Sequence, residues 1–361
     1  MQIDLEDVLA LGDSLDKVLA NYPAGVASLQ ALKNPGALRA DTERQLTDLG
    51  VRYLHNPVSH GSVDLRAQAL LAERCGRSLY HGAGLFQDVV GGYVVSQLAQ
   101  LPAGLSTQQM EEGRFTVTAP LGNDPMGHAV QARETPGGWA LDGVAPMVPY
   151  AAESTHVLIG AQTESGVERY FLLPMPSAGV QARHGRALDG MALSALLLRG
   201  VQLPQDAMVG GDEVGRALAQ GQRHATLLLC FEAVGLMEQL MRKTTEYLQI
   251  RKQFGKAIGT FQALQHRMVG VLLMLEQTRS AAQLALDAMA GAADDRDVRL
   301  SAAKYTVGVH GQKVAEECIQ LHGGIGMTWE LDVSHYAKRL VMLDHYFDSA
   351  DQSLSNVMAS L

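Results

Sequence analysis

The stretch that decides the fold covers residues 224–267, HATLLLCFEAVGLMEQLMRKTTEYLQIRKQFGKAIGTFQALQHR. In its first part, side chains that can pack against a core recur at steps of three and four residues, the period of a helix with one buried face. These side chains are Leu227, Phe231, Val234, Met237, Met241, Thr244 and Leu248. The pattern stops at Arg251, and a second apolar helix starts near Phe261. We therefore predict two long helices joined by a short turn.

The turn between these two helices carries side chains that suit a ligand with a diphosphate and a flat ring. Arg251 offers a planar fork of donors to phosphate oxygens, and Phe254 offers a ring surface. Gly255 and Gly259 leave room for a tight corner. A purely structural role is the alternative. Arg251 would then be a solvated charge at a helix end and Phe254 a ring in the core, because composition alone does not fix a role.

The turn and a second motif together resemble the acyl-CoA dehydrogenase family. R-x-Q-F-G-x-x-I-x-x-F-Q-x-x-Q-H begins at Arg251, and Q-L-H-G-G-I-G-M-T-W-E begins at Gln320. The resemblance is strong over 223–361 and weak before it, although the order of segments fits along the whole chain. In that family the two motifs bind FAD from different subunits of a dimer.

The resemblance implies a set of FAD contacts on each side of such an interface. On the diphosphate and ring side they would be Arg251, Gln253, Phe254, Phe261 and Gln265. From the neighbouring chain they would be Gln320, Gly323 and Gly324. His322 lies inside the second motif, where we expect it to satisfy backbone groups rather than to act in acid–base chemistry.

Composition indicates a globular protein with sizeable cores. The 361 residues are 47% hydrophobic and 19% charged, which gives room for two or three packed units. A net charge of -9 argues against nucleic acid as a partner. We find no apolar run of membrane-spanning length and no signal peptide. Three widely separated cysteines predict buried thiols in a reduced, cytoplasmic protein, without a metal site.

Three segments with different secondary-structure patterns follow one another along the chain. Residues 1–110 contain amphipathic or apolar helical runs, which we place at 5–19, 39–49, 63–76 and 85–101. Residues 111–211 contain short β-rich runs separated by Gly, Pro, Asn and Asp, as in an antiparallel sandwich or barrel. Residues 212–361 are helical again. The helices expected there are 213–249, 260–291, 295–321 and 331–359.

We therefore predict an α+β fold of the acyl-CoA dehydrogenase type. It would consist of an N-terminal helical domain (1–110), a middle antiparallel β-domain (111–211) and a C-terminal four-helix bundle (212–361). No G-x-G-x-x-G motif follows a strand and opens a helix, so a Rossmann domain is not supported.

The resemblance implies a reaction that removes two hydrogens from the α and β carbons of an acyl-CoA thioester. FAD would take the β-hydrogen, and a glutamate with a pKa raised by burial would take the α-proton. In the family this glutamate lies either after the G-G-x-G motif or on the helix ahead of R-x-x-F-G. Counted from the motifs, those two places hold Phe347 and Ala225, neither of which can accept a proton.

Two aspartates near these places could replace the missing glutamate. Asp348 directly follows Phe347 and is our only candidate for a catalytic residue, and Asp351 lies one helical turn further on. We interpret three remaining acids as helix-surface or capping groups. These are Glu232, Glu238 and Glu330.

The middle segment also departs from the family pattern. T-E-P-x-A-G-S-D, whose Thr and Ser line the flavin and the thioester, reads T-A-P-L-G-N-D-P here, so Thr118 is retained as a weaker FAD contact. W-I-T-N, which covers the flavin, reads M-V-P-Y from Met147, and Pro149 has no N–H to offer. Met126, Met147 and Tyr150 are candidates to line the acyl cleft.

Three hypotheses can account for these losses. In the first, the chain is one subunit of a heteromeric acyl-CoA dehydrogenase for a bulky or unusual substrate, of the steroid side-chain or dicarboxylic type. A second subunit would carry the glutamate, and the C-terminal run resembles the small subunits of pimeloyl-CoA-type enzymes. In the second, a self-sufficient homo-oligomer uses Asp348, or works as an oxidase or monooxygenase that needs no base. The third is a non-catalytic scaffold without flavin, against which the retained motifs argue. Electrons would leave through an electron-transfer flavoprotein.

Overall fold

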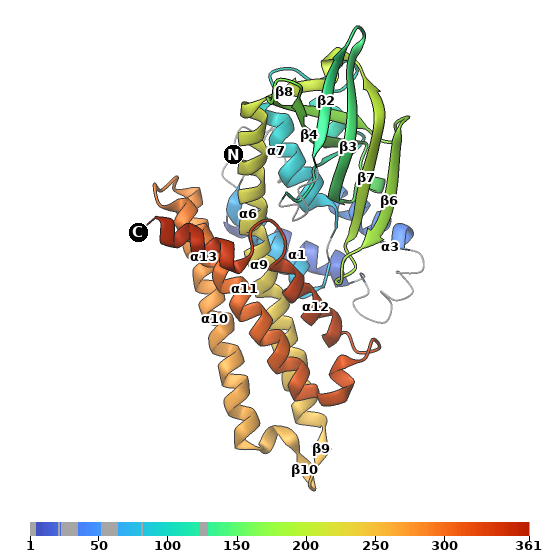
Figure 1. The fold of residues 1–361 in the computed structure, drawn as a ribbon. Helices are drawn as coiled ribbons and strands as arrows, with labels where there is room; N and C mark the ends of the chain where they lie inside the picture. Colours follow the sequence, from blue (N-terminus) through green and yellow to red (C-terminus); the bar gives the residue numbers. More distant parts are fainter. Residues whose placement is uncertain are drawn as a thin grey trace. The chain divides into compact units, whose positions relative to one another are not determined.

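The computed structural model describes residues 5–20, 22, 35–51, 64–80, 82–122 and 129–360. Contacts divide the chain into two compact units (Figure 1). The β unit comprises Met1, Gly50–Val63 and Gly82–Ala225, and the helical unit comprises Gln2–Leu49, Asp64–His81 and Thr226–Leu361. The N-terminal helices are thus shared between the two units. The three-domain boundaries at 110 and 211 stay a prediction.

Short helices precede the sheet. Within the described residues they are α1 (Leu5–Ala20), α3 (Pro35–Asp48), α6 (Leu65–Arg77), the π-helix η1 (Leu85–Gly91), α7 (Gly92–Gln97) and α8 (Thr107–Glu111). Asp64 caps α6 by accepting the N–H groups of its first turn, and a Ser106–Gln109 capping box starts α8. The apolar run 85–101 is not one continuous α-helix, because it opens with π-helical turns and α7 ends at Gln97.

One mixed sheet forms the middle of the β unit. In the described part of the chain its order is β6-β7-β3-β2-β4-β5-β8, with β1 paired to β4. The strands are β1 (Val117–Thr118), β2 (Val130–Thr135), β3 (Gly138–Pro149), β4 (His156–Thr163), β5 (Glu168–Pro174), β6 (Val180–Arg186), β7 (Ala192–Leu203) and β8 (Met208–Gly210).

The expected β domain is confirmed, although its sheet is not wholly antiparallel. β2 and β3 form a hairpin, and the short helix η2 (Ala151–Glu153) then returns the chain to the other side of β2. For this reason β4 runs parallel to β2, and β1 also pairs parallel to β4.

Both faces of the sheet carry an apolar core, because successive side chains of a strand point to opposite faces. Val157 and Ile159 of β4 join Phe171 of β5 in a cluster on one face. Leu158 and Leu172, which alternate with them, pack on the other face with residues of α7, α8 and the first turns of α9 (Asp212–Ile250).

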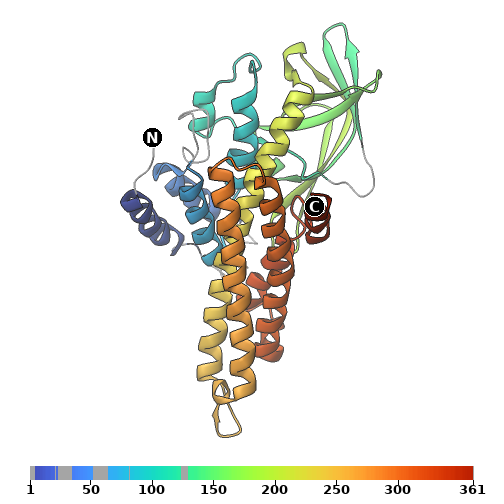
Figure 2. The ribbon, with the colours of Figure 1, turned by 90° about the vertical axis from the view of Figure 1, so that its left-hand side faces the viewer.

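The helical unit is dominated by long helices. The part of α9 after Ala225 lies in this unit with α10 (Gln262–Ala290), α11 (Arg296–His322), α12 (Val333–Leu343) and α13 (Ala350–Ala359). Figures 1 and 2 both show α10 and α11 side by side along much of their length. The predicted pair of long helices joined by a short turn is confirmed. None of the described helices is long and apolar enough to cross a membrane.

The predicted final helix 331–359 is wrong. Residues 344–349 separate α12 from α13, and Phe347 has a φ of 61°. A bulky residue rarely adopts this left-handed backbone, and it cannot continue a right-handed helix. Helical periodicity in the sequence did not reveal the break, since apolar residues continue on both sides of it.

Helices α6 and α9 approach each other at two glycines. A Cβ atom at Gly76 would lie 2.1 Å from the carbonyl oxygen of Glu232, and one at Gly235 would lie 2.0 Å from that of Glu73. Neither position can carry a side chain without moving the two helices apart. The close approach brings charged side chains of both helices within reach of each other.

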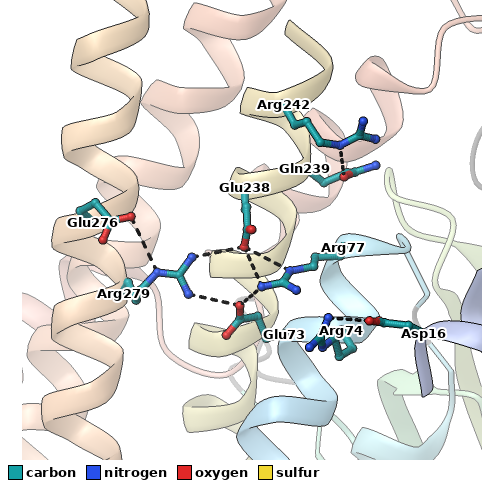
Figure 3. A network of polar contacts seen from close by, with 9 residues as sticks. All are labelled: Asp16, Glu73, Arg74, Arg77, Glu238, Gln239, Arg242, Glu276 and Arg279. Carbon is teal, nitrogen blue, oxygen red and sulfur yellow. Dashed lines mark hydrogen bonds and ion pairs between the residues drawn. The ribbon is translucent and has the colours of Figure 1, made fainter. Parts of the chain in front are cut away.

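A four-residue charge network links α6, α9 and α10 beside this contact. Arg77 lies 2.5 Å from Glu73 and 2.9 Å from Glu238, and Arg279 lies 3.2 Å from each of the same two carboxylates. Figure 3 shows both guanidinium groups between the two glutamates. Glu73 therefore links α6 to α10, and Glu238 links α9 to both α6 and α10.

A buried ion pair connects α9 with α12. The Nε atom of Arg339 donates to Glu232 Oε1 at 2.6 Å, and a second guanidinium nitrogen donates to Oε2 at 3.0 Å. The Arg339 side chain is 2% exposed and that of Glu232 10%. The interpretation of Glu232 as a helix-surface or capping group is therefore wrong, because a charge on the core side of α9 is tolerated once it has a bidentate partner.

We expect Arg339→Leu to lower the free energy of unfolding by about 3–5 kcal/mol, because Glu232 would remain buried and unpaired. Arg299→Ala, which removes the exposed ion pair with Asp295, is the control and should change it by about 1 kcal/mol or less. Denaturant unfolding of the full chain measures both. A loss for Arg339→Leu no larger than that of the control would show that the pair is not needed.

Candidate functional site

The turn between α9 and α10 is a β-hairpin at one end of the helical unit (Figure 1). β9 (Lys252–Gln253) pairs antiparallel with β10 (Lys256–Ala257), and Phe254 and Gly255 form the turn with φ values of 53° and 82°. Positive φ at both positions is typical of a type I′ turn. This conformation suits Gly255 but is strained for a phenylalanine. Phe254 is 91% exposed.

Backbone hydrogen bonds hold the base of the hairpin. The N–H of Ile258 donates to the carbonyl of Arg251 at 2.8 Å, and the side-chain amide of Gln265 donates to the carbonyl of Gly259 at 2.9 Å. The Arg251 and Gln253 side chains are exposed. Arg251 is thus anchored by its backbone while its guanidinium group remains accessible to a ligand.

Aromatic and cationic side chains gather on the hairpin. The ring of Phe261, the residue just before α10, meets that of Phe254 edge-on at 6.1 Å between centroids. The Lys256 ammonium group lies 4.3 Å from the centre of the Phe261 ring. With Arg251 and Lys252, this short segment is cationic in a chain of net charge -9.

The second motif lies where α11 ends. Gly323 has a φ of 65° and terminates the helix, and the 3-10 turn η5 (Gly323–Met327) follows. A Cβ atom built at Gly323 or Gly324 meets nothing within 4 Å, so the backbone there is open to an approaching group. Gln320, in the last turn of α11, is also exposed.

Tyr247 and His322 join the two motifs within one chain. Their rings stack with centroids 4.5 Å apart, and the Tyr247 hydroxyl donates to the His322 carbonyl at 3.3 Å. The Nδ1 atom of His322 lies 2.8 Å from the carbonyl oxygen of Cys318, and burial lowers the pKa of the imidazole. The interpretation of His322 as a residue that satisfies backbone groups is confirmed. That FAD is shared between subunits stays a prediction.

The donor set at this end of the helical unit fits an anionic ligand such as a diphosphate. The hairpin offers exposed cationic side chains with exposed aromatic surface next to them, and η5 offers open glycine backbone; the family resemblance assigns these two groups to different subunits of one site. Arg251 is its strongest single donor, because a guanidinium group can bind phosphate oxygens in a bidentate way. Among the described residues, no group of three or more His, Cys, Asp and Glu side chains could hold a metal ion.

Thr118 lies in the other unit, in strand β1. Its side chain is fully buried, and its hydroxyl donates to the carbonyl of Pro149 at 2.8 Å. Its contact with FAD stays a prediction. Met147 is 36% exposed and Tyr150 1%. Met126 lies outside the described residues.

Both positions of the family base hold apolar side chains. Ala225 is fully buried in α9, and Phe347 lies in the segment between α12 and α13. Asp348 is half-buried next to the buried Lys304. Burial lowers the pKa of the Lys304 amine, while negative charge from groups that include Asp348 opposes this shift. Asp348 therefore helps to compensate a buried cation.

The sequence did not predict a role for two buried polar residues of η1. Gln87 is 3% exposed and Asp88 is 6% exposed, although they lie in an otherwise apolar run. No motif marks them. The polar pair itself could have indicated such a role. An apolar helix that carries consecutive polar residues must either pair them inside the protein or turn them to solvent.

One protein-family model and several curated proteins match the sequence of this chain. Residues 216–346 match the model described as "Acyl-CoA dehydrogenase, C-terminal domain". The chain is 26% identical over 294 residues to the mitochondrial long-chain specific acyl-CoA dehydrogenase of Sus scrofa, with 76% of this chain and 68% of that protein covered. It is 35% identical over 139 residues to acyl-CoA dehydrogenase FadE34 of Mycobacterium tuberculosis. This alignment covers 37% of this chain and only 19% of FadE34.

Solved structures share the fold over nearly the whole chain. The ChsE4-ChsE5 complex from Mycobacterium tuberculosis superposes with a TM-score of 0.81 at 21% identity and covers 100% of this chain and 98% of that one. A glutaryl-CoA dehydrogenase from Mycobacterium smegmatis in complex with FADH2 gives 0.83 at 19% identity, with 99% and 95% covered. The expected fold class is confirmed, and FAD is the cofactor of the matching family. The chain thus resembles acyl-CoA dehydrogenases in its C-terminal part by the family-model match and over most of its length by its relatives, and it shares the acyl-CoA dehydrogenase fold.

Proposed function

We propose that the chain is one subunit of an FAD-dependent acyl-CoA α,β-dehydrogenase, and that a second acyl-CoA dehydrogenase subunit carries the catalytic glutamate. One observation carries this proposal. Phe347 and Ala225 occupy both positions of the family base, while the hairpin and η5 keep an accessible set of phosphate donors. A chain that had lost flavin altogether would have no need of an exposed cationic hairpin with an exposed phenyl ring.

The surroundings of Asp348 support a base supplied by a partner. This carboxylate lies beside the buried Lys304, which also donates a hydrogen bond to the carbonyl of Leu343. Asp348 is one of the acids whose negative charge favours the charged form of the Lys304 amine, so it has a structural role in the fold.

Exposed apolar side chains near the two motifs support a subunit contact at this end of the helical unit. Ile250 and Phe254 on the hairpin side are 75% and 91% exposed, and Ile325 and Met327 of η5 are 49% and 75% exposed. Large apolar residues grouped in this way are typical of surfaces that a partner covers. The shared fold with the ChsE4-ChsE5 complex is consistent with such a partner.

We propose a bulky acyl-CoA of the steroid side-chain or dicarboxylic type as the substrate.

The residues of this chain would act by binding and orientation. Arg251 and Gln253 would hold the diphosphate of one FAD, and Phe254 and Phe261 would offer surface to its rings. Gln320, Gly323 and Gly324 would approach the diphosphate of a second FAD, across the subunit interface. Bound FAD supplies a two-electron acceptor for the substrate. The α-proton would go to the partner's carboxylate, because neither Phe347 nor Ala225 can accept it. We propose an electron-transfer flavoprotein as the final acceptor.

The visible spectrum of the purified chain is the first test. We expect a colourless or weakly coloured protein when the chain is expressed alone, and a flavin band when it copurifies with an acyl-CoA dehydrogenase subunit encoded beside it. A chain that is fully loaded with flavin and active by itself would overturn the proposed division of labour and support a self-sufficient enzyme.

Arg251→Ala should weaken flavin retention in the complex, because a charge-assisted phosphate contact worth about 1.5–3 kcal/mol is lost. This corresponds to a rise of roughly tenfold to a hundredfold in the Kd for FAD. Arg242→Ala is the matched control, since Arg242 is an exposed arginine of α9 that pairs with Glu246. FAD titration followed by fluorescence measures both variants. Equal affinities would remove Arg251 from the site.

Asp348→Asn should leave the dehydrogenase activity of the partner-containing complex unchanged, because the base belongs to the other subunit. Asp351→Asn, at an exposed position in the first turn of α13, is the control. Activity is measured with an artificial electron acceptor at matched flavin content. If Asp348→Asn alone abolished turnover while flavin was retained, the self-sufficient hypothesis would be favoured.

A further inference from the structure

We propose that Gln87 is a positioning residue that fixes residues 147–150, the segment that replaces the family's flavin-covering motif. This segment is called the 147–150 corner below. The inference rests on the proposed function, because only a bound flavin gives the corner a ligand to face. It concerns the β unit alone, where every residue of the argument lies.

The 147–150 corner is strained at two residues. Met147 has a φ of 52°, and Tyr150 has φ 51° and ψ 29°, which is left-handed backbone. Neither is a glycine, and Tyr150 is a large side chain that is 1% exposed. Strain of this kind persists only where the surrounding structure holds it, and it is frequent at ligand-binding sites.

Backbone hydrogen bonds hold the corner on two sides. The carbonyls of Met147 and Pro149 accept from the N–H of Leu121 at 3.1 Å and from the hydroxyl of Thr118 at 2.8 Å. The N–H of Tyr150 donates to the carbonyl of Ala192 at 3.0 Å. The Tyr150 carbonyl accepts from the N–H of Glu153 at 2.9 Å, and as a carbonyl oxygen it can accept a second donor.

Gln87 completes this set through Ser154. Its side-chain amide donates to Ser154 Oγ at 2.8 Å and to the carbonyl of Glu153 at 3.2 Å. The Ser154 hydroxyl in turn donates to the Tyr150 carbonyl at 2.9 Å. The Gln87 and Ser154 side chains are both buried, so the relay from amide to hydroxyl to carbonyl is shielded from competing water.

The π-helix explains how Gln87 reaches the corner. π-helical turns are rare and recur at functional sites. Here η1 buries Phe86 and Gln87 one after the other, and the Phe86 ring lies 5.9 Å from that of Tyr150. A Cβ atom at Gly91 would lie 1.9 Å from the Val117 carbonyl oxygen, so η1 is also held tightly against β1.

The first test needs no ligand. In the full chain, Gln87→Leu should speed hydrogen exchange of a peptide covering 147–154 by about tenfold, the effect of losing one buried hydrogen bond. Gln68→Leu is the matched control, because Gln68 is a helical glutamine that is 2% exposed in the other unit. Unchanged exchange at 147–154 in Gln87→Leu, relative to Gln68→Leu, would overturn the positioning role.

Ser154→Ala tests the same relay if Gln87→Leu does not fold. It removes the middle of the relay and should speed exchange of the same peptide. In the Gln87→Leu, Ser154→Ala double variant the effects should be less than additive, because both act through the Tyr150 carbonyl. Independent, additive effects would contradict the relay.

The second test asks whether the corner serves the flavin. In the flavin-containing protein, with its partner subunit where that is required, Gln87→Leu should raise the Kd for FAD severalfold and shift the flavin absorption band, whereas Gln68→Leu should do neither. Faster exchange with an unchanged Kd and spectrum would overturn the link to the flavin. A wild-type protein that binds no FAD, alone or with any partner, would instead overturn the proposed function, and the exchange data would still judge the relay.

Discussion

The bidentate ion pair between Glu232 and Arg339 is the constraint on which the helical unit depends. Both charges are shielded from water, so each needs the other, and α9 and α12 must therefore meet in one register. The Arg339 guanidinium group also lies 5.2 Å from the centre of the buried Tyr346 ring. A second buried cation, Lys304, donates to the carbonyl of Leu343 at the end of α12. Two buried cations thus define where α12 stops and how the chain continues to α13.

This arrangement has a direct consequence for the chemistry of the chain. The segment after α12 holds Phe347 at one position of the family base, and Ala225 fills the other. A proton acceptor needs a carboxylate in a shielded place, and both places here are apolar. Binding a phosphate needs only accessible cations and open backbone, and the hairpin and η5 retain both. Loss of the base and retention of the ligand contacts are therefore compatible within one fold.

The candidate ligand contacts of the two units differ in kind. The hairpin presents Arg251 and Phe254 at the surface, on a turn held by a few backbone hydrogen bonds. The 147–150 corner is the opposite case, because its polar groups are tied internally and only Met147 is partly exposed. An exposed hairpin can adapt to a ligand or a partner, whereas a strained corner held by Thr118 and Gln87 offers a preorganised surface.

The sequence by itself determined the features that depend on neighbours along the chain. Helical periodicity predicted α9 and α10, and Gly255 with Gly259 indicated the turn, because period and turn chemistry are local properties. The two motifs indicated the family and FAD. Tertiary structure decided the rest: the parallel pairing of β4 with β2, the break at Phe347, the burial of Glu232 and the role of Gln87. Each of these depends on a partner distant in sequence, and no local pattern reports the burial or the hydrogen bonds that such a partner provides.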